Sequence, residues 1–88
     1  MHAVVVRVSV QEVEKATEDL RTNVVPEVKR APGFVAGYWT RSGDNGLAMI
    51  VFESEDAARQ AADRIPQSIE QQPVTLDNIE VREVVANA

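Results

Sequence analysis

The side chains of this sequence that could take part in chemistry are few, and two of them are adjacent. Trp39 and Tyr38 are the only tryptophan and the only tyrosine, and they lie in a segment with the composition of a β-strand. Neighbouring strand residues point to opposite faces of a sheet. Trp39 could therefore form the wall of a site for a planar ligand, with the Tyr38 hydroxyl as an alternative polar contact. The competing interpretation is that both rings fill space in a core or an interface.

Three further residues complete the set of candidate pocket residues. Arg7 is the one charge in the apolar segment 3–10, where it could anchor an anion or a phenolate, or instead pair with Glu53 or Glu83. His2 could serve as a general base, although a place next to the terminus favours a solvated side chain. Phe34 opens the strand that carries Trp39. No carboxylate pair, nucleophile–base pair or glycine-rich phosphate loop is evident.

The composition narrows the class of protein. The 88 residues are expected to form one domain, residues 1–88, with no cysteine for a disulfide or a thiolate metal site. With a single histidine as well, we expect neither a metal nor another cofactor. The net charge of −5 disfavours binding to a nucleic-acid backbone. Neither a signal peptide nor an apolar run of about 20 residues is present, which predicts a cytoplasmic protein without a membrane partner.

A first helix is expected directly after the first apolar segment. Ser9 and Glu12 form an S-x-x-E pattern typical of a capping box, which predicts a helix start near residue 10 or 11. Pro26 should kink or break this helix near residues 23–25. Its apolar residues recur at spacings of three and four and share one face: Val13, Ala16, Leu20, Val24 and Val28.

Four segments have the β-branched and aromatic composition of strands. They cover residues 3–10, 34–41, 47–53 and 79–85. The short polar loop between the second and third segments predicts an antiparallel hairpin. The pairing stays open, because a three-residue loop would place Trp39 opposite Met49 and a four-residue loop would place it opposite Ala48. Pro32 and Gly33 should end the helical segment that precedes this hairpin.

A second helix is expected after the third strand. Ser54 predicts its N-terminus, and acidic residues in the first turn suit the helix dipole. Its small residues form a face that can lie close on a sheet: Ala57, Ala58, Ala61, Ala62 and Ile65. Pro66 should stop or bend this helix. The polar segment 66–75 leaves open whether another helical turn follows.

The order strand, helix, strand, strand, helix, strand indicates an α+β fold. Right-handed crossovers then give a ferredoxin-like βαββαβ unit with an antiparallel sheet ordered 4-1-3-2. RNA-recognition domains use the same topology, and residues 45–52 match their third-strand motif at several positions. Leu47 and Met49 replace the two aromatic residues that stack on bases, so we expect no nucleic acid as partner.

Either orientation of the strands leaves aliphatic side chains on the sheet face that the two helices do not cover. Leu47, Met49 and Val51 lie on that face if the motif match holds in register. An aliphatic patch of this kind invites association, and a second copy in twofold symmetry would cover it. We therefore expect a homodimer with its two sheets packed face to face.

This layout, together with the segment PGFVAGYWTRSGDNGLAMIVFE (residues 32–53), resembles the dimeric α/β-barrel superfamily. The most similar branch contains small proteins related to antibiotic-biosynthesis monooxygenases. Shared features are the chain length, a Pro-Gly-Phe entry into the second strand, a Tyr-Trp pair and an apolar third strand followed by a Glu-led helix.

The resemblance implies a cofactor-independent monooxygenase, an oxidoreductase acting on phenolic or quinol-like aromatic compounds. The first strand lacks the asparagine, and the second helix lacks the histidine, of relatives that degrade haem. These missing polar residues leave a second interpretation open. In it, the homodimer binds a small apolar metabolite or a protein partner without catalysis. Under either interpretation, the candidate pocket residues are Trp39, Tyr38, Arg7, His2 and Phe34.

Overall fold

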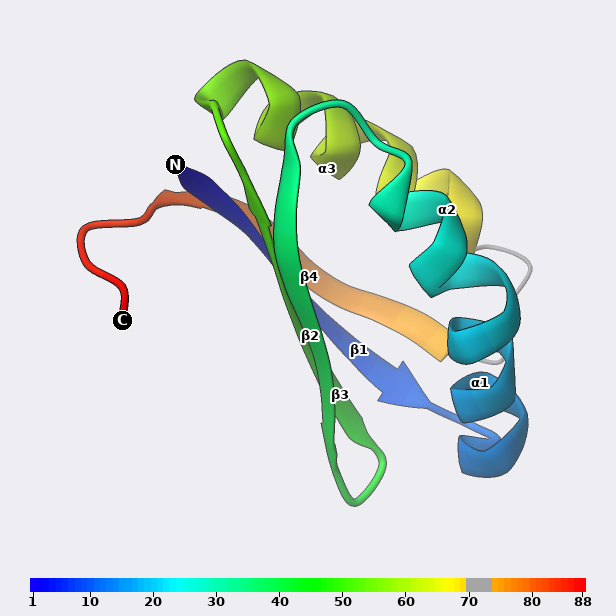
Figure 1. Ribbon diagram of the computed structural model, residues 1–88. Coiled ribbons are helices and arrows are strands. Elements are labelled where there is room, and N and C mark those ends of the chain that lie inside the picture. Colours follow the sequence, from blue (N-terminus) through cyan, green and yellow to red (C-terminus); the bar gives the residue numbers. More distant parts are fainter. Residues whose placement is uncertain (70–73) are drawn as a thin grey trace.

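The computed structural model describes residues 1–69 and 74–88, which form a four-stranded antiparallel sheet with helices on one face (Figure 1). The strands are β1 (His2–Val10), β2 (Phe34–Ser42), β3 (Asn45–Phe52) and β4 (Val74–Glu83). Their order in the sheet is β2-β3-β1-β4, which is the predicted order read from the other edge. The predicted α+β class and strand order are confirmed, and they are compatible with a ferredoxin-like fold.

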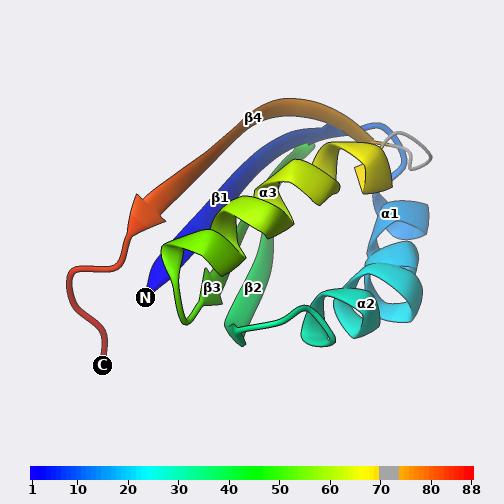
Figure 2. The same ribbon diagram turned by 90° about the horizontal axis from the view of Figure 1, so that it is seen from above.

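The helical layer has two parts. The first is a helical arm of α1 (Val13–Asp19), the π-helical segment η1 (Leu20–Val24) and α2 (Val25–Lys29), and the second is α3 (Glu55–Ile69). Seen from above, α3 runs along β1 while the arm stands apart from it on the same side of the sheet (Figure 2). The helical layer is therefore open between its two parts.

The start of the arm differs from the capping-box prediction. The residue before α1 is Glu12, and no side chain caps the helix. Ser9 still belongs to β1, where its hydroxyl donates to the Asp77 carboxylate over 2.7 Å. The prediction failed because pairing with β3 and β4 continues to the end of β1. The Ser9 hydroxyl therefore bonds to a residue of β4 and not to the N-terminus of the helix.

The predicted break at Pro26 is a wider turn instead. The backbone N–H of Val25 donates to Leu20 O, five residues earlier, and Pro26 then stands in the first turn of α2. Proline has no N–H to donate and its ring crowds the carbonyl four residues before it. A π-turn directly before Pro26 removes both conflicts, so the arm stays helical through Lys29. The arm ends at Lys29, before the predicted helix end, and Gly33, with φ of +80°, lies in a tight turn in which the Phe34 N–H donates to Ala31 O over 3.2 Å.

The core lies between the central strands and α3. Val4, Ile50 and Phe52 are almost completely buried, and Ala58 of α3 has no exposed surface. The predicted small-residue face of α3 packs against these residues. Ser54 caps the helix, since its Oγ accepts a hydrogen bond from the Ala57 N–H over 3.2 Å. Small side chains let this helix approach the sheet closely, which the arm does not do.

Two ends differ from the sequence-based boundaries. α3 does not stop at Pro66 but continues to Ile69. β4 begins at Val74 rather than residue 79, because residues 74–78 still pair with β1 across a register shift opposite Arg7 and Val8, where Asp77 is the extra residue. The further helical turn left open for the segment 66–75 is present over residues 66–69, which belong to α3, and residues 70–73 fall outside the described part of the chain.

Candidate functional site

A cavity of about 1140 Å³ lies between the sheet and the two parts of the helical layer. Its floor is the helix-facing side of the sheet, including Val6, Ala48 and Trp39. The arm forms one wall and α3 the other, through Ala57, Ala61 and Ile65 among others. The volume is large enough for a small organic molecule, and such sites are mostly apolar with a few polar groups.

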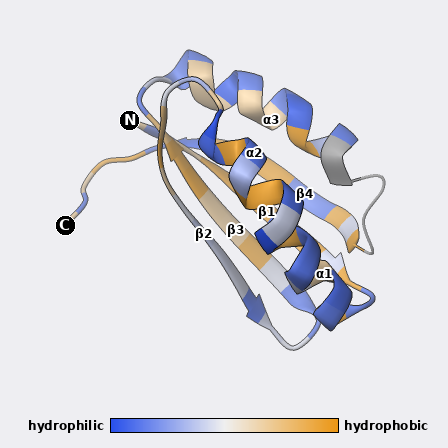
Figure 3. Ribbon diagram, turned by 45° about the vertical axis from the view of Figure 1, so that its right-hand side comes forward, coloured by the Kyte–Doolittle hydropathy of each residue, from blue (hydrophilic) through white to orange (hydrophobic). Residues whose placement is uncertain are grey.

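The arm contributes the apolar stripe that the sequence predicts. All five members of the stripe line the cavity: Val13, Ala16, Leu20, Val24 and Val28. Figure 3 shows apolar residues on the arm and on β1 and β3. A helix normally buries such a stripe against its sheet. Here the stripe faces a cavity, so much of its area is free to contact a bound molecule.

Trp39 occupies the sheet side of this cavity because of the hairpin register. Trp39 pairs with Ala48 and Tyr38 with Met49, the register of the four-residue alternative, around a two-residue turn that begins at Gly43. Gly43 has φ of +61°, which suits the first position of a tight hairpin turn. The open question of the pairing is thereby settled, and Trp39 faces the helices.

The indole ring lies along its own strand, over Gly37. A β-carbon placed on Gly37 would approach the Trp39 ring atoms Cζ3 and Cη2 to 2.9 Å, closer than real contacts allow. The absence of a side chain at Gly37 therefore gives the ring room to lie flat. A flat, half-buried indole at the edge of an apolar cavity is suited to stacking on a planar molecule.

Of the five candidate pocket residues, only Trp39 lines the cavity. Tyr38 and Arg7 point to the other face of the sheet, where Tyr38 is 68% exposed. Phe34 packs edge-on against Phe52, with ring centroids 6.3 Å apart, and belongs to the core. The expected pairing of Arg7 with Glu53 or Glu83 is not found within residues 1–69 and 74–88.

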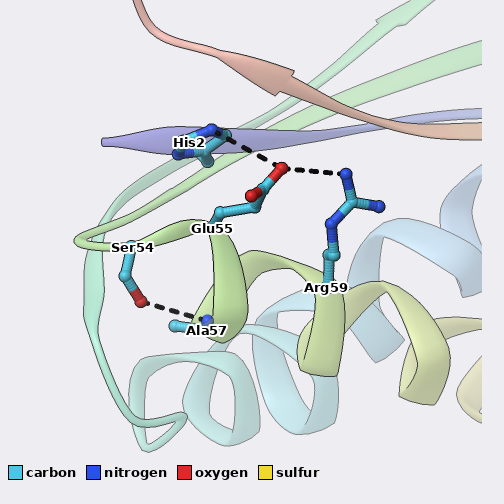
Figure 4. Close-up of polar contacts among 5 residues, drawn as sticks. All are labelled: His2, Ser54, Glu55, Ala57 and Arg59. Atoms are coloured by element: carbon cyan, nitrogen blue, oxygen red, sulfur yellow. Dashed lines mark hydrogen bonds and ion pairs between the residues drawn. The ribbon is translucent and has the colours of Figure 1, made fainter.

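His2 lies outside the cavity, next to the N-terminus of α3 (Figure 4). Its Nε2 is 4.0 Å from a Glu55 carboxylate oxygen, which accepts a hydrogen bond from Arg59 over 2.9 Å. The hydrogen bond and the charge of Arg59 lower the pKa of Glu55 below its ordinary value. Glu55 is thus kept ionised by Arg59, and His2, Glu55 and Arg59 are not among the residues that line the cavity.

The candidate pocket residues from the sequence did not include the polar residues of the cavity. Asp19 and Asn23 line it from the arm, and Gln60 and Arg64 line it from α3. The helix break expected near residues 23–25 gave Asn23 only a local role. The sequence did carry a signal for its place in the cavity, because Asn23 adjoins Leu20 and Val24 of the predicted stripe, and a residue beside an inward-facing stripe lies at the margin of the same space.

The opposite side of the sheet, here called the open face, carries three rows of paired residues. The rows are Ala36–Val51–Ala3–Arg82, Tyr38–Met49–Val5–Glu80 and Thr40–Leu47–Arg7–Asn78. Its middle is apolar, and Tyr38 and Met49 remain 68% and 43% exposed. This face has no helix over it (Figure 1).

Compared with models of known protein families and with curated proteins, the chain matches none. The residues that the structure describes include no helix long and apolar enough to cross a membrane. Across the same residues, no three or more His, Cys, Asp or Glu side chains gather as a metal site would require. The cavity is therefore the feature of the molecule that points to a function.

Proposed function

We propose that the protein binds a small, planar, apolar molecule in the cavity between its sheet and its helical arm. The observation that carries the proposal is the arrangement of Trp39 and the arm, with a flat indole on one side and an unfilled apolar stripe on the other. Each apolar side chain that a ligand shields from water contributes about 1.5–3 kcal/mol when fully covered. The geometry suits a binding module, because no nucleophile–base pair was found among the described lining residues.

The single tryptophan gives a direct test. The protein is titrated with 2-methoxynaphthalene, and binding is measured as displacement of a bound fluorescent probe such as 1-aminoanthracene. The titration should saturate at one ligand per chain. Trp39→Ala should weaken binding at least tenfold. Tyr38→Ala is the matched control, because the adjacent ring lies on the other face of the same strand and should leave the affinity unchanged. Equal losses in both variants, or no saturable binding, would refute the proposal.

A second candidate function is oxygenation of a phenolic or quinol-like molecule in this cavity without a cofactor. Arg30, Arg41 and Arg64 belong to its lining, and a neighbouring cation favours the ionised form of a phenol. In the expected reaction, anthrone and O₂ give anthraquinone and water. The substrate methylene supplies the electrons, one oxygen atom enters the new carbonyl and the other leaves as water.

This activity can be separated from simple binding. Anthrone or a dihydroxynaphthalene incubated with protein under O₂ should consume oxygen above the rate in buffer, and Trp39→Ala should reduce the rate. Saturable binding with no oxygen consumption above buffer would leave the binding function and remove the enzymatic one.

The dimeric α/β-barrel arrangement is also a proposal. Two copies would pack their open faces together, because Tyr38, Met49 and Leu47 otherwise remain in contact with water. The cavity lies on the other side of each sheet, so this association would leave both cavities accessible.

A further inference from the structure

The polar pair Asp19 and Asn23 lies beside the apolar stripe of the arm, where Thr17, Glu27 and Arg30 are the other polar lining residues. The two residues are one helical turn apart on the arm, and both line the cavity. Asn23 belongs to η1, and π-helical turns occur frequently at functional sites. The pair stands beside the stripe that faces Trp39, so it can reach a polar group on a molecule that lies against the indole.

The hydrogen bond within the pair fixes what Asn23 offers. Its Nδ2 donates to Asp19 Oδ1 over 2.6 Å. An ionised carboxylate can only accept hydrogen bonds, so the amide must turn its N–H group toward Asp19 and its carbonyl oxygen away. Within the described part of the chain, Asn23 Oδ1 has no hydrogen-bond partner. In this orientation the pair presents two kinds of acceptor, the Asp19 carboxylate and Asn23 Oδ1, and its remaining donor is the second N–H of the Asn23 amide.

We infer that Asp19 and Asn23 select, within the proposed ligand class, planar molecules that carry a hydrogen-bond donor, a hydroxyl or an N–H group. This inference rests on the proposed function of the cavity and assigns its polar selectivity to the arm. A donor on the ligand bonds to Asn23 Oδ1 or to the carboxylate of Asp19. A ligand whose only polar atom is an acceptor can bond only to the second N–H of Asn23, and that neutral bond is weaker than a bond to the carboxylate.

Two ligands of nearly equal shape test this selectivity. 2-Naphthol has a donor, whereas 2-methoxynaphthalene has only an acceptor at the same position. By probe displacement, 2-naphthol should bind about five- to tenfold more tightly, the gain of one hydrogen bond. Asn23→Leu should reduce that preference in part, because the Asp19 carboxylate remains as an acceptor. Gln60→Leu is the matched control, because it removes a polar group from the opposite wall of the cavity and should keep the preference.

Asp19→Ala supplies a second, independent readout. Without Asp19, the amide of Asn23 can turn and offer its N–H group, so 2-methoxynaphthalene should gain affinity relative to 2-naphthol. This variant carries the test if Asn23→Leu does not fold, as judged by circular dichroism.

The outcomes separate the two proposals. Equal binding of the two ligands to the unaltered protein, or a preference that is unchanged in both Asn23→Leu and Asp19→Ala, would overturn the role of the pair and leave the cavity as a binding site. No saturable binding of either ligand would remove the proposed function, and the inference with it.

Discussion

The position of the Trp39 ring depends on the absence of a side chain at Gly37. Because a β-carbon at Gly37 would stand 2.9 Å from the indole, Gly37→Ala should push the ring toward the cavity or tilt it. We expect a shifted tryptophan emission maximum and binding of 2-methoxynaphthalene weakened about tenfold, with the protein still folded. Gly43→Ala is a control at the hairpin turn, where open space surrounds the residue but φ is positive. It should cost stability without changing the emission, and unchanged emission in Gly37→Ala would contradict this account.

The Glu55–Arg59 pair predicts a small acid sensitivity. A carboxyl group whose pKa is lowered by folding stabilises the folded state above its unfolded pKa, about 4.3 for glutamate. That stabilisation is lost as the pH falls through the lower folded pKa. Arg59→Met removes the cause, so its melting temperature should fall less between pH 5 and pH 3 than that of the unaltered protein. Both groups are well exposed, so the difference should be small.

At this scale, the sequence predicted the identity of the key residue but not the composition of the site. Trp39 could be singled out because large aromatic residues are rare in this chain and alternate faces along a strand. The roles of Tyr38 and Phe34 depended on the hairpin register and the core packing, which distant residues determine. Asn23 adjoins the predicted apolar stripe, but the helix break expected near residues 23–25 hid its place beside Asp19 on a continuous helical arm.

Pro26 shapes the arm as an element. Pro26→Ala restores a backbone N–H and removes the ring, so the π-turn should relax toward regular α-helix. We expect altered backbone chemical shifts over Leu20–Val24 and weaker binding of 2-naphthol, because the residues of η1 would rotate relative to the cavity. Pro66→Ala is the matched control in α3, a helix without a π-turn in its described part, and should leave both measurements unchanged.

Secondary structure followed the local signals wherever no neighbouring strand competed for them. The Ser54 cap and the left-handed conformation of Gly33 were predictable because their partners lie within a few residues. The Ser9 capping box failed because its hydroxyl bonds to Asp77, which is 68 positions away in sequence. The start of β4 was missed for a related reason, since residues 74–78 are held by β1 rather than by their own composition.

For the molecule as a whole, the open face predicts association. Sedimentation equilibrium should give twice the chain mass of 9.7 kDa. Met49→Lys places a charge in the middle of the open face and should yield monomers, because burying an unpaired ammonium group is costly. Val85→Lys is the control, since Val85 is also an exposed aliphatic residue but lies after the end of β4. A monomer at millimolar concentration would argue against the sheet-to-sheet dimer.

The bulge in β4 has a consequence for how this chain can change in length. Asp77 and Asn78 occupy the place of one residue opposite β1, so the strand carries a spare position. At a regularly paired position, losing one residue would exchange inside for outside along the remainder of the strand. A deletion at Asp77 would remove its bond to Ser9 but straighten the ladder, with Leu76 and Ile79 still directed inward. Asp77, like Val35 at the register shift of β2, is therefore a strand position at which natural variants of the chain could lose a residue and keep the same fold.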